Sequence, residues 1–282
     1  MTPIFLYTLR HHLRRAAAFA RWGAALRRAP VLFANSFPKS GTHLLTQILQ
    51  GMTRLGPAVD SGLPAVLTYE GTSGRERTSA EIAADLRRLR PGDIGFGHIH
   101  ARPDITPLLC RPGVAPYFIV RDPRDIVVSH VHYVTDIAQQ HVHQPYYRFL
   151  PDFESRLRVS ILGLDDVRWP FPDIAQRFAP YQGWLDHPEV RLLHYEDYLW
   201  DRRAFLGDVL DHAVARGFPL KIPREQAISL LEGALNPEKS PTFRKGKAGA
   251  WREHFTPAIK QCFKDVAGDL LIALDYEDDD DW

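Results

Sequence analysis

Short apolar runs alternate along the chain with longer stretches in which apolar residues recur every three or four positions. The runs predict buried strands, and the periodic stretches predict helices. The clearest unit is the run 31–37, which stops at Pro38 and is followed by a helical pattern over 42–52. Further strands are predicted over 94–100, 117–120 and 190–194, and further helices over 80–90, 123–133, 152–163, 201–215 and 224–234. This alternation predicts an α/β fold, a single domain with a mainly parallel central sheet flanked by helices.

The N-terminal end differs from the rest of the chain in charge. The first 28 residues hold six arginines and no acidic residue, so we expect a basic helical segment over residues 1–30 ahead of a domain over residues 31–282. A helix over residues 4–28 could lie on an anionic membrane surface as a peripheral contact, or pack on the domain as a solvated helix. Its longest apolar stretch is far shorter than the roughly 20 residues that a membrane-spanning helix needs. No spanning helix is therefore expected.

Overall charge and cysteine content narrow the classes of function. The 35 basic and 34 acidic residues give a formal net charge of +1, which argues against bulk binding of nucleic acid. The two cysteines, Cys110 and Cys262, have no Cys-x-x-Cys partner, which argues against a disulfide scaffold or a cysteine zinc site. A reducing, cytoplasmic location fits this pattern.

A candidate phosphate-binding loop lies where the first predicted strand passes into a helix, a P-loop-like position. It consists of Lys39, Ser40, Gly41 and Thr42. Free backbone N–H groups and the helix dipole favour a phosphate there, and Gly41 allows the backbone to approach it closely. In nucleoside triphosphatases the lysine follows the last glycine, so the order found here argues against an ATP γ-phosphate site. The alternative is an ordinary helix cap.

Two further basic segments could complete an anion site. Arg121 ends a predicted strand, and Ser129 lies in the helix that follows. Both could face the first loop if their strands are neighbours, whereas the structural alternative is an ion pair of Arg121 with Asp122 or Asp125. The other basic segment, a clamp over a phosphate or a solvated loop, consists of Arg244, Lys245 and Gly246.

Taken together, these segments resemble the sulfotransferase family that uses 3'-phosphoadenosine 5'-phosphosulfate (PAPS). The matching segments, in the family's order, are Phe37-Pro-Lys-Ser-Gly-Thr42, Ile119-Val-Arg-Asp-Pro-Arg-Asp-Ile-Val-Val-Ser129, Tyr195-Glu196-Asp197 and Arg244-Lys-Gly-Lys-Ala-Gly-Ala-Trp-Arg-Glu-His-Phe255. The resemblance implies a cytosolic-type enzyme that moves a sulfuryl group from PAPS to a hydroxyl and needs no metal. It implies that the first loop holds the 5'-phosphosulfate, with Lys39 on the bridging oxygen, and that Tyr195 lies near the adenine. The implied ligands of the 3'-phosphate are Arg121, Ser129, Arg244, Lys245 and Gly246.

The base in this family is a histidine on the strand between the first two motifs, and two candidates occur there. The strand reads Phe96-Gly97-His98-Ile99-His100. Strand alternation puts His98 and His100 on one face, so either could reach a bound hydroxyl. The family's Thr-His-Leu pattern is matched best around His98, which we predict to be the catalytic base, with His100 on the acceptor side. Whichever of the two is not the base would be a hydrogen-bonded core residue.

The sequence specifies the acceptor poorly. Tyr133, Tyr146 and Tyr147 could line an aromatic acceptor pocket, and segment 56–79 could cover it. Core packing of Tyr146 and Tyr147 is an equal alternative. The expected acceptor class is a hydroxyl on a small molecule, a glycan or a lipid.

Three positions or segments depart from the family pattern. Phe96 stands where a lysine often precedes the catalytic histidine, and Leu44 stands where a tryptophan often stacks on adenine. Segment 252–261 keeps only part of the family's dimer motif, because Pro257 and Gln261 replace two of its residues. These departures leave open how the missing charge and the adenine contact are replaced, and which oligomer forms.

Other functions compete with this hypothesis. A P-loop kinase would need a triphosphate loop and a carboxylate for Mg²⁺, and only Asp122 resembles the latter. A nucleotide-binding adaptor without activity would use residues 4–28 as its membrane anchor. Three His-x-His pairs raise the question of a metal site. Helical residues i and i+2 do not share a face, so the second pair below, on a predicted helix, is a poor chelate. No metal is therefore expected. The pairs are His98/His100, His130/His132 and His141/His143.

Overall fold

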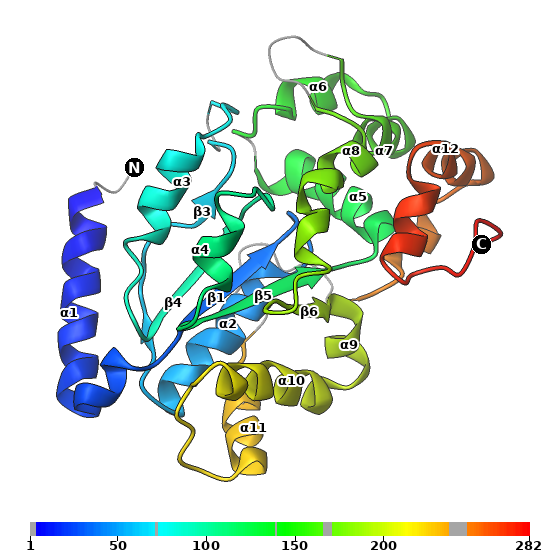
Figure 1. The fold of residues 1–282 in the computed structure, drawn as a ribbon. Helices are drawn as coiled ribbons and strands as arrows, with labels where there is room; N and C mark the ends of the chain where they lie inside the picture. The colour runs from blue at the N-terminus through cyan, green and yellow to red at the C-terminus, as the bar shows by residue number, and fades with distance from the viewer. Residues whose placement is uncertain (1–3, 71–72, 139, 166–170, 237–246) are drawn as a thin grey trace.

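A parallel β-sheet runs through the centre of the molecule (Figure 1). The computed structural model describes residues 4–70, 73–138, 140–165, 171–236 and 247–282. Within them the strands are β1 Val31–Ser36, β2 Val59–Asp60, β3 Val66–Leu67, β4 Asp93–His98, β5 Val114–Val120 and β6 Arg191–His194. They lie in the order β2-β4-β1-β5-β6, β3 also pairs with β4, and every pairing is parallel. Because β1 lies between β4 and β5, the carboxyl ends of these three strands meet at one edge of the sheet.

Helices cover both faces of the sheet (Figure 1). One face packs against α2 Thr42–Gly51, α9 Tyr195–Trp200, α10 Arg202–Ala215 and α11 Arg224–Glu232. The other packs against α3 Ser79–Leu86, α4 Thr106–Cys110, α5 Pro123–His132, α6 Gln144–Phe149, α7 Phe153–Leu162, α8 Ile174–Phe178 and α12 Pro257–Ala273. Short 3-10 turns occur at Gly23–Arg27, Met52–Arg54, Ala179–Trp184 and Ala250–Glu253, and a π-helical turn, Tyr133–Ile137, extends α5.

The core forms because each central strand is apolar on both faces. In β1, Leu32 and Ala34 point into the cluster beneath α2, while Val31 and Phe33 point into the opposite cluster. A strand covered by helices on both faces needs such a continuous apolar run rather than an alternating one. The sheet consequently holds its polar loop ends at fixed positions between two packed layers.

The structure confirms the predicted fold class and corrects some boundaries. The strand predicted over 94–100 ends at His98. The segment predicted as a loop over 56–79 contains β2 and β3, which are too short to produce a pattern. Helix α12 was not predicted, and the non-helical backbone at Ala267 interrupts it. Thr78 caps α3 with a capping box.

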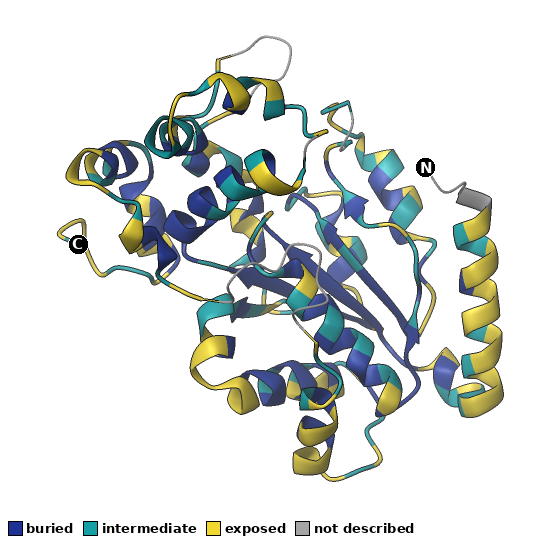
Figure 2. Cartoon of the chain, turned by 180° about the vertical axis from the view of Figure 1, so that it is seen from behind, coloured by how far each residue is buried: buried dark blue, intermediate teal, exposed yellow. Residues whose placement is uncertain are grey.

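Helix α1, Ile4–Trp22, lies against the β2–β4 edge of the sheet and presents its other face outward (Figure 2). Asp93, fully buried at the start of β4, accepts from His11 at 2.7 Å and forms an ion pair with Arg15. The outward face exposes Leu6, Leu9, Leu13 and Phe19. Of the helices that the structure describes, none is long and apolar enough to cross a membrane.

Candidate donor-binding and transfer site

The loop between β1 and α2 has the geometry of an anion cradle. Lys39 and Gly41 have φ of 74° and 103°, and this sharp turn lets α2 begin at Thr42. Helix α2 has no side-chain cap, so its first N–H groups point to a ligand position. The Ser40 hydroxyl is buried and has no hydrogen-bond partner among the described residues. An unpaired buried hydroxyl is costly, and an anion bound at this loop would satisfy it.

Lys39 is a cation in a poorly solvated position. Its Nζ lies 3.9 Å from the centre of the Tyr133 ring. Burial, together with the nearby charge of Arg121, lowers the pKa of Lys39 to about 8. Both causes disfavour the ammonium, and an anion beside Nζ would reverse them. Lys39 is therefore suited to a strongly anionic ligand.

His98 ends β4 directly beside this loop. Its Nδ1 lies 2.9 Å from the carbonyl oxygen of Ser36, and because a carbonyl can only accept, Nδ1 carries the proton and Nε2 keeps the lone pair. The Ser36 hydroxyl contacts the same Nδ1 at 3.2 Å and Thr42 Oγ1 at 2.6 Å, which ties the histidine to the start of α2. Burial lowers the pKa of His98 to about 4. At neutral pH the ring is therefore neutral and can accept a proton at Nε2.

His100 has different surroundings from those of His98. Its ring is 7% exposed and packs edge-on against Tyr69 and Tyr181, with centroids 5.4 and 4.8 Å away. Burial lowers its pKa to about 4 as well. The expectation that one strand face presents both histidines is wrong, because β4 ends at His98 and the alternation ends with it.

Arg121 leaves β5 at the same edge and holds a second cationic position. Its Nη2 donates to Asp125 Oδ2 and to the carbonyl oxygen of Lys247, both at 3.1 Å. The Arg121 Nε is buried and has no partner among the described residues, so this N–H remains available to a ligand after the Arg121–Asp125 ion pair has formed. Asp125 also accepts from the N–H groups of Gly249 and Trp251, both at 2.9 Å. One carboxylate thus fixes a C-terminal segment beside Arg121.

Tyr195, the first residue of α9, lies between the two cationic positions. The Arg121 guanidinium lies 4.7 Å from the centre of its ring. A Cβ placed on Gly41 would lie 2.7 Å from Tyr195 Cδ2, so this close approach requires glycine. The next residue, Glu196, accepts from the Asp122 N–H at 3.1 Å, which fastens the start of α9 to the end of β5.

The other predicted site residues differ in how close they lie to this loop. Ser129 is half-buried on α5, and Tyr146 is half-buried on α6. Tyr133 contacts the loop through the Lys39 ammonium. Tyr147 is fully buried, and its hydroxyl lies 3.2 Å from His130 Nδ1. These surroundings match the alternative in which Tyr147 packs in the core. The residues of the basic clamp lie outside the described residues: Arg244, Lys245 and Gly246.

A cavity of about 640 Å³ opens at the edge of the sheet beside β4. Strands β2 and β3 pair with the two ends of β4, so Gly95 and Phe96, which pair with β1 on one side, have no partner strand on the other. Segment 61–70, α3 and Phe96 form its walls. Leu67, which pairs with His98, lines the cavity together with Val66, whereas His98 itself is not among the lining residues. Phe96 thus adds apolar surface where the family's lysine would add charge.

Comparisons with known proteins agree with this geometry. No family model matches the chain. Sulfotransferase 1E1 of Cavia porcellus is 28% identical over a region that covers 33% of this chain and 41% of that relative. A mouse sulfotransferase complexed with PAP, SULT7A1, matches 92% of this chain and 88% of its own, with a TM-score of 0.55 and 18% identity. The chain has the sulfotransferase fold. Retinol dehydratase, in complex with androsterone and the inactive cofactor PAP, has the same fold, with a TM-score of 0.56, 18% identity and coverage of 90% and 85%.

Some residues that shape the site were not identified from the sequence. Ser36 holds the ring of His98, and Asn35 bonds both to the N–H and to the carbonyl of Ile99, which aligns β1 with the end of β4. The only signal was a polar Asn-Ser pair at the end of an otherwise apolar strand. Such a pair gains meaning only when the neighbouring strand is known.

Proposed function

We propose that this protein transfers the sulfuryl group of PAPS to a hydroxyl of an acceptor molecule. One observation carries the proposal: Ser40 Oγ and Arg121 Nε, two buried donors without partners among the described residues, lie after neighbouring parallel strands, with Tyr195 packed against both loops. The relative that supports it is matched over less than half its length, and the solved neighbours, crystallised with PAP, support the fold.

The two cationic positions suit a donor that carries two separate anionic groups. The first loop would hold the 5'-phosphosulfate, with Lys39 on the bridging oxygen and the α2 N–H groups on the phosphate. Arg121 would hold the 3'-phosphate, together with Ser129 and the basic clamp. Lys247, the first described residue after the clamp, lies beside Arg121, which donates to its carbonyl oxygen, and Asp125 holds Gly249 at the same place. ATP has no 3'-phosphate and would leave the second position empty.

The transfer itself needs positioning and charge stabilisation more than covalent catalysis. The acceptor oxygen forms a bond to sulfur as the bond from sulfur to the bridging oxygen breaks, and PAP leaves. The acceptor proton passes to Nε2 of His98, whose other nitrogen is committed to Ser36. Lys39 stabilises the negative charge that develops on the leaving oxygen. In this proposal His98 accepts the proton and Lys39 stabilises the charge.

The cavity beside β4 is the proposed acceptor pocket. Leu67 and Phe96 give it apolar walls, and segment 61–70 lines it. Its size fits a small hydroxylated molecule. Tyr133, His100 and Tyr146 remain proposed as further acceptor contacts. A screen of alcohols, phenols, glycans and hydroxylated lipids with labelled donor would identify the class.

The kinase alternative loses its candidate Mg²⁺ ligand. Both carboxylate oxygens of Asp122 bond to the guanidinium of Arg124, at 2.9–3.1 Å, and Asp122 Oδ1 also caps α5. A carboxylate in that position serves the fold rather than a metal ion. The donor geometry described above therefore favours sulfuryl transfer over phosphoryl transfer.

Binding and turnover together test the proposal. Calorimetry should show PAP binding much more tightly than ATP, and the labelled sulfuryl group should pass to an acceptor. The Arg121→Ala variant should bind PAP about tenfold to a hundredfold more weakly, the value of a lost charge-assisted hydrogen bond. Arg87→Ala, at an exposed arginine outside the site, is the matched control. Equal affinity for PAP and ATP would overturn the proposal.

We also propose that α1 brings the protein to an anionic membrane surface. The exposed leucines Leu6, Leu9 and Leu13, the last of them 63% exposed, follow one side of the helix, and Arg10 and Arg21 are exposed beside them. Vesicles that contain phosphatidylserine should sediment the protein, and neutral vesicles should not. Leu13→Glu should abolish this, whereas Leu230→Glu, at a surface leucine of α11 that is 39% exposed, should not. Sedimentation that is unaffected by Leu13→Glu would refute the contact.

A further inference from the structure

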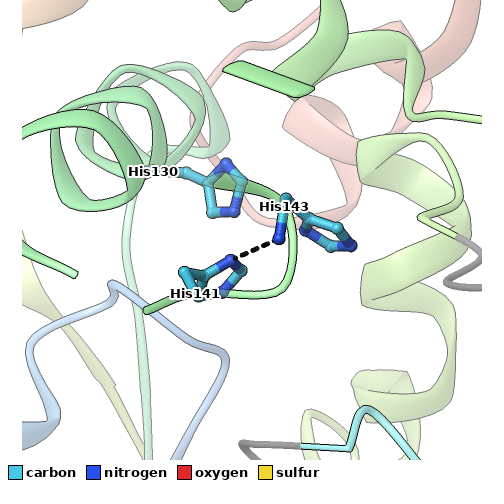
Figure 3. A group of neighbouring side chains, drawn as sticks. All are labelled: His130, His141 and His143. Atoms are coloured by element: carbon cyan, nitrogen blue, oxygen red, sulfur yellow. Dashed lines mark hydrogen bonds between the residues drawn. The ribbon is translucent and has the colours of Figure 1, made fainter. Parts of the chain in front are cut away.

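Three histidines that are separated in the sequence lie together near Lys39 (Figure 3). His130 comes from α5, and His141 and His143 come from the loop between the π-helical turn and α6. One ring nitrogen of each lies within 4.8 Å of one ring nitrogen of each of the others. The sequence had placed these residues in two separate pairs, and the structure brings one member of the first pair to both members of the second.

The hydrogen bonds of His130 leave one nitrogen for a ligand. Ser160 Oγ donates to the carbonyl oxygen of Val127 at 2.9 Å, so its only proton is already used. The same Oγ lies 3.2 Å from His130 Nδ1, so it can only accept there, and the Tyr147 hydroxyl, also 3.2 Å from Nδ1, can accept as well. Nδ1 then carries the proton, and Nε2 keeps the lone pair. A hydroxyl that orients the far nitrogen is the arrangement that supports a metal-bound histidine.

His141 offers Nδ1 as a ligand nitrogen, although its lone pair now accepts a hydrogen bond. The main-chain N–H of His143 donates to His141 Nδ1 at 3.2 Å, the dashed line in Figure 3, so Nδ1 is an acceptor nitrogen. An ion that bound there would replace this long hydrogen bond. Phe171 supports the other two rings, stacked on His130 at 5.0 Å and tilted against His143 at 4.4 Å between centroids.

We propose that His130, His141 and His143 form a binding site for a transition-metal ion of the zinc class. Neutral imidazole is a preferred ligand of Zn²⁺, Co²⁺, Ni²⁺ and Cu²⁺, and three histidines with one open position form a common zinc arrangement. Tetrahedral Zn–N bonds of about 2.0–2.1 Å place ligand nitrogens about 3.3–3.4 Å apart, so nitrogens that now lie within 4.8 Å of one another must approach by up to about 1.5 Å. Water would take the fourth position.

The charges around the cluster select the kind of ion. Lys39 and Arg177 lie close enough to lower the pKa of His130, after burial, which is the main cause. The cluster itself contains no carboxylate. Hard cations such as Mg²⁺ and Ca²⁺ need oxygen ligands and negative charge, so they should not bind here. Zinc-class ions gain their affinity from nitrogen bonds and should bind despite the two cations.

Metal binding by the chelator-treated full chain tests this proposal, without donor or acceptor. Equilibrium dialysis against Zn²⁺, with the metal content measured, should give one tightly held ion per chain, and Mg²⁺ should not compete. Co²⁺ should give the visible absorption bands of a tetrahedral site. His141→Ala should weaken binding at least about tenfold, since even loss of a supporting residue costs that much. His12→Ala, at an exposed histidine of α1, should bind as the unaltered protein does.

The outcomes separate this site from the proposed transfer reaction. His143→Gln provides a second variant, and circular dichroism of both variants checks that they fold. Zinc that binds equally well to His141→Ala and His143→Gln, or no tight binding to the unaltered chain, would overturn the proposal. PAP binding and turnover are measured separately, so failure of the metal site would leave the sulfuryl-transfer proposal in place.

Discussion

Replacing His98 with asparagine should remove the base and keep the contact that holds it. The amide N–H of asparagine can take the place of Nδ1, which lies 2.9 Å from the Ser36 carbonyl oxygen. Asparagine has no counterpart of Nε2, the nitrogen that would accept the proton. The loop, α2 and the donor site should therefore keep their geometry, and affinity for PAP should stay near that of the unaltered protein.

The expected loss is confined to the rate of transfer. Removal of a general base costs about a hundred-fold to ten-thousand-fold in rate, or about 3–5 kcal/mol of activation free energy. The pKa of His98, lowered by burial to about 4, also sets the acid side of the pH profile. The neutral ring is the base, so kcat/KM should hold through pH 6 and fall only as the pH approaches about 4. An acid limb near the ordinary histidine value of about 6.5 would contradict this assignment.

Labelled PAPS and an acceptor from the screen give kcat and KM, and calorimetry gives PAP affinity. His100→Asn is the matched control, because it removes ring contacts with Tyr69 and Tyr181 that are worth about 0.5–1.5 kcal/mol each. It should lower Tm and alter KM for the acceptor while leaving transfer active. If His100→Asn is inactive and His98→Asn still turns over, the choice of base is wrong, although sulfuryl transfer would stand.

Lys39→Ala should lose most turnover, because the leaving oxygen loses its nearest cation, and activity within a few-fold of the unaltered protein would refute that role. The ammonium of Lys39 exists below its pKa of about 8, so kcat/KM should fall as the pH rises above about 8, and a flat profile to pH 10 would contradict this. Gly41→Ala should lower Tm and PAP affinity together, since its Cβ would lie 2.7 Å from Tyr195 at a φ of 103°. Asp125→Asn should weaken PAP binding by releasing both Arg121 and the segment beside it, and unchanged affinity would show that the tether is dispensable.

The sequence alone was enough to predict the parts of this site that depend on local structure. An apolar run followed by Lys39–Thr42 and a helical pattern predicts a strand, a tight loop and a helix, because each depends on interactions within a few residues. The same holds for Pro123 at the start of α5. Four motifs in one order also indicated the donor, and the solved neighbours agree with the fold that they imply.

Only the tertiary structure decided how these parts meet. Strand order places His98, Ser36 and Arg121 at one edge of the sheet, although 62 residues separate the first two. The early end of β4 separated the two candidate bases, and the tautomer of His98 follows from a carbonyl on another strand. The histidine cluster around His130 and the carboxylate tether of Asp125 likewise join distant segments. Such contacts arise from the packing of whole elements, so no local pattern in the sequence records them.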